Sequence, residues 1–283
     1  MIKTSLHKQQ GLTLIELMIS MTLGLFVVFA VGSILVTSNK TASISSTLSD
    51  SQDTGRFTVS YITRQILRAG FNPSQDRNAP KLTAFPPICT ADPNDVMCLS
   101  NSDDSDAGDR IAIRRTAEAG SDNAVTCSGS RLQASGADIA TDAIVVDAFW
   151  VGPDSNNRLN LRCQTYDADG TTLGVAGTAF STAESLAMGV VGMQVLYGES
   201  NNPPEDQIFS VNRYVSADNV TDWDNVYAIR LAIITESLSS TQALASEKIY
   251  SLLDANQYTY NDQTLRQVFT TTITLLNLAR GEE

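Results

Sequence analysis

The chain begins with a short polar stretch and then becomes abruptly apolar. The run from Leu12 to Val36 is mostly apolar and contains one charged residue, Glu16. A helix of that length would cross a hydrocarbon core of roughly 30 Å. The polar stretch before it carries Lys3 and Lys8 and no acid, and positive charge keeps its end of a membrane helix in the cytoplasm. The pattern predicts a single membrane pass with the carboxyl terminus exported.

The pattern then changes to that of a helix with one apolar face. Residues 37 to 53 are rich in Ser, Thr and Ala without a strong apolar stripe, so alone they would form a weak helix or a linker. Apolar residues then recur at steps of three and four, namely Val59, Ile62, Ile66 and Ala69. Gly70 and the Asn-Pro pair that follows form a stop signal. We predict one long helix from about Leu12 to Ala69, loosened near Gly55, whose second half packs on a globular domain.

The rest of the chain has the pattern of a β-rich domain. Residues 72 to 108 carry most of the prolines and a cluster of acids, which is typical of a loop. Strand-like runs separated by Gly, Asn and Asp follow at 110–114, 143–151, 158–163, 188–197, 226–236 and 268–276. The predicted fold class is α+β, with an antiparallel sheet laid on the carboxyl half of the long helix.

Composition and charge exclude several classes of function. The net charge of −12 argues against binding to nucleic acid, because that binding needs clustered Lys and Arg. Arg114, Arg115 and Arg131 are the candidates for a basic surface, but acids surround them. The sole histidine, His7, precedes the apolar run. If that segment is removed, Ser-His-Asp catalysis, Cys-His catalysis and His-ligated metals are excluded. We expect no enzymatic activity, no metal and no cofactor.

Two acidic stretches are candidate calcium-binding loops, namely Asp103 to Asp109 and Asp167 to Gly170. Both fail the full EF-hand spacing. Counting from Asp103 places Gly108 at the sixth loop position, but the twelfth is Arg114, where a bidentate Glu is required. We expect solvated turns at both stretches.

The boundary between the polar stretch and the apolar run carries Gly11 followed by Leu-Thr-Leu-Ile-Glu. An ordinary secretory signal is cut after its apolar stretch, at small residues. A cut at the boundary would instead retain the apolar helix in the mature protein. It would also place a new α-amino group on Leu12, about one helical turn from Glu16. A carboxylate in a membrane needs such a partner, in its own chain or from a neighbouring subunit.

The segment from Gly11 to Leu17 resembles the type III signal of type IV pilins and of type II secretion pseudopilins. The resemblance implies a prepilin peptidase that cuts after Gly11 and methylates the new amino terminus on Leu12, although the usual first residue is Phe. It also implies that Glu16 sets the register of the subunit in a filament. The expected parts are a cleaved leader (1–11), a transmembrane or filament-core helix (12–36), its amphipathic continuation (37–70) and an exported β-rich domain (71–283).

Further segments resemble the PilW family of minor pilins. In the first half of the chain they are Gln52–Phe57, Arg68–Phe71, Gly108–Arg114 and Thr126–Gly129. In the second half they are Leu161–Cys163, Gly189–Gly198, Arg213–Val215, Trp223 with Val226–Arg230, and Arg266–Thr272. We interpret these side chains as structural, because half-buried strands commonly carry such residues.

The resemblance implies a minor pilin of the type IV pilus, which primes pilus assembly in the inner membrane and sits at the pilus tip. Its expected partners are other minor pilins, the major pilin, the prepilin peptidase and the inner-membrane assembly platform. Its expected location is the bacterial inner membrane, with the amino terminus cytoplasmic and the exported domain periplasmic, and then the pilus. The alternatives are a J-type minor pseudopilin of type II secretion and a tip subunit for adhesion or DNA uptake.

The four cysteines show no C-x-x-C spacing, and an even number in an exported chain suggests two disulfides. Cys89 and Cys98 are expected to form a disulfide within the acidic loop. Cys127 and Cys163 lie in two of the PilW-like segments, and we expect them to form a disulfide that closes the sheet. Four cysteines allow three connectivities, so pairing with Cys89 or Cys98 remains an alternative.

Overall fold

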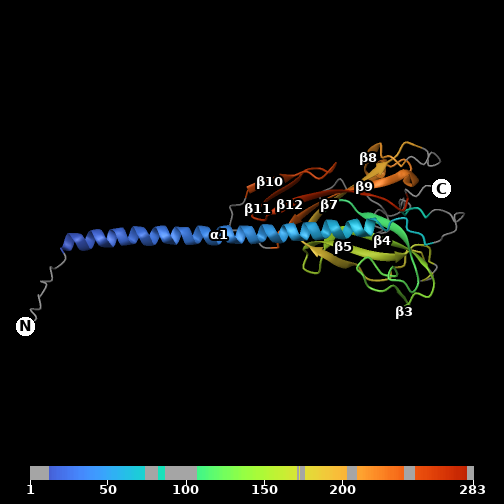
Figure 1. The fold of residues 1–283 in the computed structure, drawn as a ribbon, viewed down its shortest axis with the longest axis horizontal. Coiled ribbons are helices and arrows are strands. Elements are labelled where there is room, and N and C mark those ends of the chain that lie inside the picture. Colours follow the sequence, from blue (N-terminus) through green and yellow to red (C-terminus); the bar gives the residue numbers. More distant parts are fainter. Residues whose placement is uncertain are drawn as a thin grey trace, which may run out of the picture. The chain divides into compact units, whose positions relative to one another are not determined.

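The fold consists of one long helix and a β-rich head (Figure 1). The structure is a computed structural model that describes residues 13–73, 82–86, 107–170, 172, 176–202, 209–238 and 246–278. The helix, α1, spans Leu14–Ile66. The chain forms two compact units, Met1–Ser46 and Thr47–Glu283. We call the second unit the head, so α1 contributes residues to both units.

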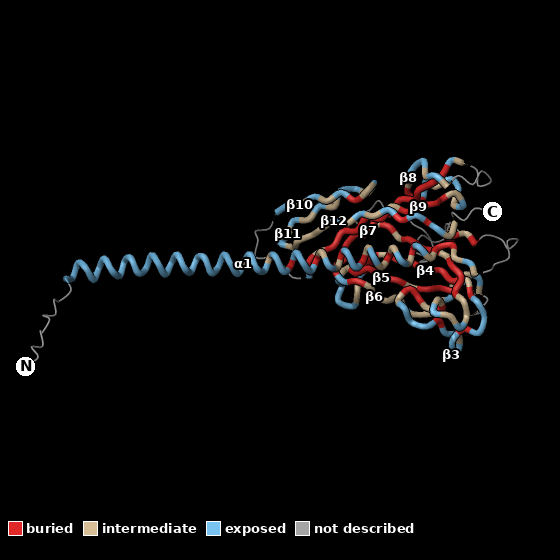
Figure 2. Tube along the Cα trace, in the orientation of Figure 1, coloured by how far each residue is buried: buried red, intermediate tan, exposed pale blue. Residues whose placement is uncertain are grey.

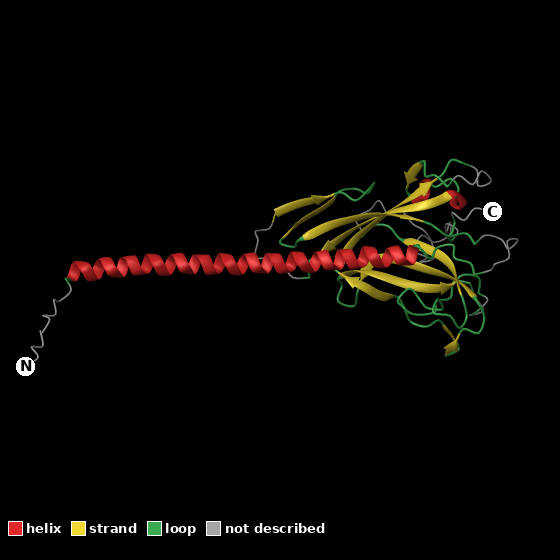
Figure 3. Cartoon of the chain, in the orientation of Figure 1, coloured by secondary structure: helices red, strands yellow, loops and turns green. Residues whose placement is uncertain are grey.

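Antiparallel strands build the described part of the head (Figure 3). The first sheet has the order β1-β4-β5-β6 and consists of β1 (Ile111–Ala117), β4 (Ala143–Pro153), β5 (Leu159–Asp167) and β6 (Glu184–Met188). The second has the order β12-β9-β7-β8 and consists of β12 (Arg266–Thr274), β9 (Val226–Glu236), β7 (Val190–Glu199) and β8 (Arg213–Val215). Two ribbons pair β2 (Gln133–Ala134) with β3 (Ala137–Asp138) and β10 (Ser246–Tyr250) with β11 (Tyr258–Asp262). Short 3-10 helices η2 (Ala217–Asn219) and η3 (Trp223–Asn225) precede β9.

This arrangement confirms the predicted α+β class and the long helix. The helix ends at Ile66 rather than Ala69 and is not interrupted at Gly55. Each predicted strand overlaps an observed one, but the strands divide between two sheets where we expected one. The split occurs because the chain leaves the first sheet after β6 and enters the second at β7.

Two glycines make the passages between the sheets possible. Gly189 lies between β6 and β7 with φ +77°, and a Cβ there would lie 2.7 Å from the carbonyl oxygen of Glu236. Gly108 precedes β1 with φ +92° and forms a parallel bridge with Met193 of β7. A Cβ on Gly108 would lie 2.0 Å from the carbonyl oxygen of Met193. Only glycine therefore fits at either crossing.

One apolar core is shared by the last turns of α1 and both sheets (Figure 2). Ile62 and Ile66 of α1 are fully buried in it. Ile113 and Phe149 of the first sheet and Ile229 of the second are also fully buried. Burial of these side chains supplies the main driving force for docking the helix end on the head.

The buried face of α1 nearer the middle of the helix is small and polar. Its residues are Thr47, Ser51, Gly55 and Thr58. The hydroxyls of Ser51 and Thr235 of β9 are 3.1 Å apart. A Cβ on Gly55 would lie 2.1 Å from the ring of Phe269 in β12. The small residues thus let the helix approach the second sheet closely, which explains why this docking face shows no apolar stripe.

The outer part of the second sheet is covered by the β10–β11 ribbon. Tyr258 and Tyr260 of the ribbon pack on Val191, Ala232 and Ile234. Tyrosines alternate with polar residues along β11, so Tyr258 and Tyr260 face the sheet while Thr259 and Asn261 are exposed. The head therefore has a small apolar cluster under the ribbon, apart from the core beneath the helix.

Candidate assembly segment and helix-receiving loop

The apolar part of α1 presents its side chains outward in every direction. Between Leu14 and Val36, the large apolar side chains are between 49% and 76% exposed. The helix is long and apolar enough to cross a membrane, with a mean hydropathy of 2.4 in its most apolar window. A helix that is apolar on all sides is stable only in lipid or among other helices. This segment is therefore suited to a membrane and to a helical bundle.

The hydroxyl groups in this apolar segment are satisfied by their own helix. Ser20 Oγ donates to the carbonyl oxygen of Glu16 at 2.7 Å, and Ser33 Oγ donates to that of Ala30 at 2.8 Å. Thr22 Oγ1 donates to carbonyls of the preceding turn in the same way. An unsatisfied hydroxyl is costly in an apolar medium. These bonds therefore make the hydroxyls compatible with lipid.

Glu16 lies in the first turn of α1, next to the helix cap. Its backbone N–H donates to Thr13 Oγ1 at 3.3 Å. Thr13 directly precedes the first helical residue, so the Thr-x-x-Glu spacing forms half of a capping box. A carboxylate also interacts favourably with the positive end of the helix dipole. Gly11 and Leu12 lie outside the described residues, so the cut between them and the pairing of Glu16 with the new amino group stay predictions.

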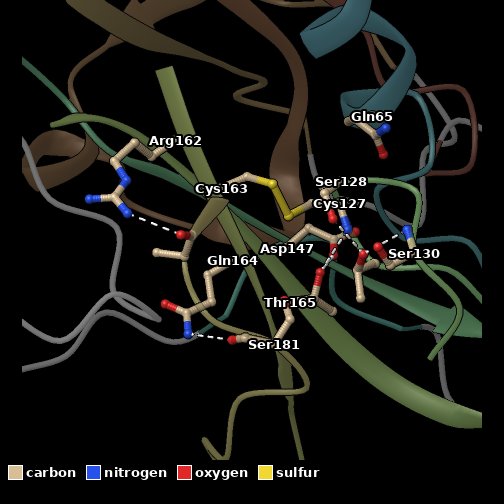
Figure 4. The surroundings of a disulfide bond; sticks show 12 residues. Gln65, Cys127, Ser128, Ser130, Asp147, Arg162, Cys163, Gln164, Thr165 and Ser181 are labelled. Carbon is tan, nitrogen blue, oxygen red and sulfur yellow. Dashed lines mark hydrogen bonds between the residues drawn. A yellow bond between two sulfur atoms is a disulfide. The ribbon is translucent and has the colours of Figure 1, made fainter. Parts of the chain in front are cut away.

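The disulfide in the head joins Cys127 to Cys163, with a sulfur separation of 2.08 Å (Figure 4). Both cysteines are buried. Cys163 belongs to β5, but Cys127 lies in the irregular segment 118–132 between β1 and β2, which we call the receiving loop. The bond therefore anchors a loop to the first sheet and does not close the sheet as we expected. Cys89 and Cys98 lie outside the described residues, so their pairing stays a prediction.

A buried ion pair lies beside the disulfide. Arg115 Nε donates to Asp147 Oδ2 at 2.7 Å, and both side chains have an exposed fraction of 0%. The other carboxylate oxygen of Asp147 accepts a hydrogen bond from Thr165 Oγ1 at 2.6 Å. The Arg115 guanidinium also donates to the carbonyls of Asn123 and Val125 in the receiving loop. The pair is thus fully desolvated and also tethers the loop.

These contacts remove Arg115 from the three arginines, Arg114, Arg115 and Arg131, that we considered for a basic surface and judged to be surrounded by acids. Arg115 is buried, whereas the Arg131 side chain is 48% exposed and lies 3.5 Å from the carboxylate of Asp122. Sequence alone did not reveal the partner of Arg115, because Asp147 lies on the neighbouring strand β4.

The last turns of α1 and the turn after it contact the receiving loop. The Tyr61 hydroxyl donates to the carbonyl oxygen of Cys127. Burial raises the pKa of Tyr61, so its phenol keeps the proton that it donates. Arg68 donates to the carbonyl oxygen of Asn123 at 3.1 Å. Burial, and after it the positive charge of Arg115, lowers the pKa of Arg68 to about 10.

Two carboxylates of the acidic stretches, those of Asp109 and Asp167, accept hydrogen bonds from backbone N–H groups. Asp109 Oδ2 accepts from the N–H of Val195 at 2.8 Å. Asp167 accepts from the N–H groups of Gly170 and Thr172 at 3.1 and 3.0 Å. Among the described residues, no group of three or more His, Cys, Asp or Glu side chains is placed to hold a metal ion. Asp103 to Asp106 lie outside the described residues.

Two family models match different parts of the chain. A family model described as a prokaryotic N-terminal methylation motif matches residues 6–32. A second model, described as type IV pilus-assembly protein W (PilW), matches residues 148–277. No curated protein matches the chain significantly. A solved structure, a type IV-like pilin from Thermus thermophilus, aligns with a TM-score of 0.44 and 16% identity, covering 81% of this chain and 98% of that one.

The two family matches cover different parts of the molecule. The methylation motif contains Glu16 and most of the outward-facing apolar segment. The PilW match begins in β4 and ends after β12, so it includes Cys163 and the whole second sheet. The PilW-like segments that we identified after Leu161 lie inside this match, and those before Gly129 lie outside it. Together, the two matches show that the chain is similar to prepilins at its amino terminus and to PilW over residues 148–277, and they support a PilW-like minor pilin of the type IV pilus.

Proposed function

We propose that the chain is made as a prepilin, cut after Gly11 and methylated on Leu12, and that it primes pilus assembly in the inner membrane and remains at the tip. The observation that carries this proposal is the apolar segment of α1, with one carboxylate, Glu16, in its first turn. This segment is suited to lipid and to a helical bundle alike, so a subunit can exchange one environment for the other without exposing apolar surface to water.

The proposed topology follows from charge and from the disulfide. Lys3 and Lys8 precede the apolar segment without an acid between them, which favours a cytoplasmic amino terminus. The Cys127–Cys163 disulfide favours a head in the oxidising periplasm. The head would then be available to other minor pilins and to the major pilin, while the helix contacts the inner-membrane assembly platform.

The proposed role of Glu16 is to set the register of the subunit. After the cut, its carboxylate would pair with the amino group of Leu12 in its own chain or in a neighbouring subunit. Either pairing neutralises a charge that is costly in the membrane. Only a subunit at the correct height in the bundle would bring the two groups together, so the pair would select one position along the helix axis.

The proposed tip position rests on the size of the head. The head spans Thr47 to Glu283 and contains both sheets together with a covering ribbon. Such a domain would crowd a close-packed shaft, whereas it would be accommodated at the end of a filament. We propose a structural rather than a catalytic role, in keeping with the matched family.

Deletion of the gene and complementation with variants test the proposal. We expect deletion to abolish surface pili while the other pilins stay in the membrane, and we expect Glu16→Ala not to restore them. Asp50→Ala is the matched control, because Asp50 is an exposed carboxylate of α1 outside the apolar segment. Normal piliation after deletion would contradict priming, and equal loss of pili with both variants would contradict the role of Glu16. Gold labelling of a tagged head along the filament shaft would contradict the tip position.

A further inference from the structure

The receiving loop connects the first sheet to the end of α1. Its Cys127 is bonded covalently to Cys163 of β5. The same residue donates its backbone N–H to Thr165 Oγ1 at 2.7 Å and accepts the Tyr61 hydroxyl at its carbonyl. One residue thus carries both the covalent anchor of the loop and the acceptor for the helix.

Other anchors of the loop lie two and four residues before Cys127, at Val125 and Asn123. Arg115 holds Val125 and Asn123 through their carbonyl oxygens, at 2.6 and 3.2 Å. Asn123 in turn accepts from Arg68, in the turn after α1. These bonds involve no sulfur, so they would remain after reduction. The contact at Tyr61 is different, because its acceptor is the backbone of a disulfide-bonded residue.

The loop has little regular structure to hold it in place by itself. Its described backbone bonds are local, such as Thr126 N to Ser130 O at 2.7 Å and Leu132 N to Ala124 O at 3.0 Å. Without the bond to β5, Cys127 itself would keep its N–H bond to Thr165. The rest of the loop would still be held by the bond from Arg115 to the Val125 carbonyl and by the buried Ala124 and Leu132. A single hydrogen bond contributes only about 0.5 to 1.5 kcal/mol net. The disulfide is therefore the strongest restraint on the carbonyl that receives Tyr61.

We propose that the Cys127–Cys163 disulfide is a redox-dependent latch, which holds the last turns of α1, residues 58–68, on the head when it is oxidised and loosens them when it is reduced. To close the latch, the two thiols lose two protons and two electrons to the disulfide of a thiol oxidoreductase, which becomes a dithiol. The consequence of the latch in the cell rests on the proposed topology. Residues 58–68 would be fixed to the receiving loop only after the head reaches the oxidising periplasm.

Hydrogen exchange on the full-length protein in detergent tests the latch. The samples are the oxidised protein, the Cys127→Ser/Cys163→Ser variant and Tyr61→Phe. We expect exchange in residues 58–68 to accelerate at least ten-fold in the serine variant, while β7 and β9 keep their protection. Tyr61→Phe loses one hydrogen bond and keeps the disulfide, so we expect an increase of about three- to ten-fold in the same residues.

Two further variants sharpen the test. Tyr227→Phe is the matched control, since the Tyr227 hydroxyl donates to Asn225 at 3.2 Å, outside the receiving loop. It should leave exchange in residues 58–68 unchanged. Tyr61→Phe combined with the two serine substitutions should exchange no faster in those residues than the serine variant alone, because the serine variant would already have lost the Tyr61 contact.

Three outcomes would overturn the latch. The first is unchanged exchange in residues 58–68 when the disulfide is absent. The second is a uniform loss of protection throughout the head, which would mean that the disulfide stabilises the whole head rather than residues 58–68. The third is an equal effect of Tyr227→Phe and Tyr61→Phe on residues 58–68. All of these readouts use purified protein, so they are independent of whether the chain primes pilus assembly.

Discussion

Replacing Asp147 by Asn isolates the energetic role of the buried ion pair. In the native head its carboxylate accepts from Arg115 at 2.7 Å and from Thr165 at 2.6 Å. The amide keeps the shape but carries no charge, and its NH2 group must face one of these two donors. The Arg115 guanidinium, with an exposed fraction of 0%, would then remain buried without a counter-charge.

The expected loss of stability is large. Removing one partner of a buried ion pair costs about 3 to 5 kcal/mol, because the other charge stays desolvated. A domain is typically stable by about 5 to 15 kcal/mol, so this substitution removes a large share. Arg68 adds a second positive charge near Arg115, because both guanidinium groups donate to the carbonyl oxygen of Asn123. This charge makes the loss of the negative charge more severe.

Urea titration of the full-length protein in detergent measures this loss. Trp150 and Trp223 both lie in the head, so tryptophan fluorescence follows its unfolding. Asp122→Asn is the control, because Asp122 is fully exposed and its pairing with Arg131 should contribute nothing measurable. A loss below about 1 kcal/mol for Asp147→Asn, or equal midpoints for the two variants, would refute the reasoning that the buried charge requires its partner.

Three further predictions concern packing and pH. Gly55→Ala gains up to about 1 kcal/mol in helix propensity. It also drives a methyl group into the ring of Phe269, at a cost of about 1 to 3 kcal/mol, so we expect a lower melting temperature. A methyl group at Gly32 meets no neighbour, so Gly32→Ala should not lower the melting temperature. Burial raises the pKa of Tyr258 to about 12. The stability that the protonated phenol contributes below pH 10 should therefore be lost between pH 10 and 12. If the urea midpoint falls equally over this pH range in the native protein and in Tyr258→Phe, the prediction is contradicted. Burial opposes ionisation of Glu199, but its hydrogen bonds, above all the one from Arg213, outweigh burial and lower its pKa. The stability that the Glu199 carboxylate contributes should therefore be lost as the pH falls below about 4.5. Glu199→Gln should make the stability less dependent on pH in this range.

The sequence revealed those features that repeat along the chain. The uniform apolar run after Gly11 predicted the first half of α1, and the spacing of Ile62 and Ile66 predicted its buried end. The long strands β4, β7 and β9 were visible because apolar residues dominate them. The motif around Glu16 was visible as a single charge in an apolar context.

Features that depend on distant partners were not visible. The docking face of α1 around Gly55 shows no apolar pattern, because the large apolar side chain in this contact, Phe269, comes from β12 of the second sheet. Arg115 resembled a surface charge because its counter-ion lies on another strand. The ribbon β10–β11 was missed because its tyrosines alternate with polar residues, and the division into two sheets became evident only with the crossings at Gly189 and Gly108.

The most direct test of the central claim is the intact mass and amino-terminal sequence of the membrane-extracted protein, with and without prepilin peptidase. A processed pilin requires a chain that begins at Leu12, carries one added methyl group and is produced only when the peptidase is present. A chain that begins at Met1 in both cases, or one that is cut beyond Val36, would contradict the account.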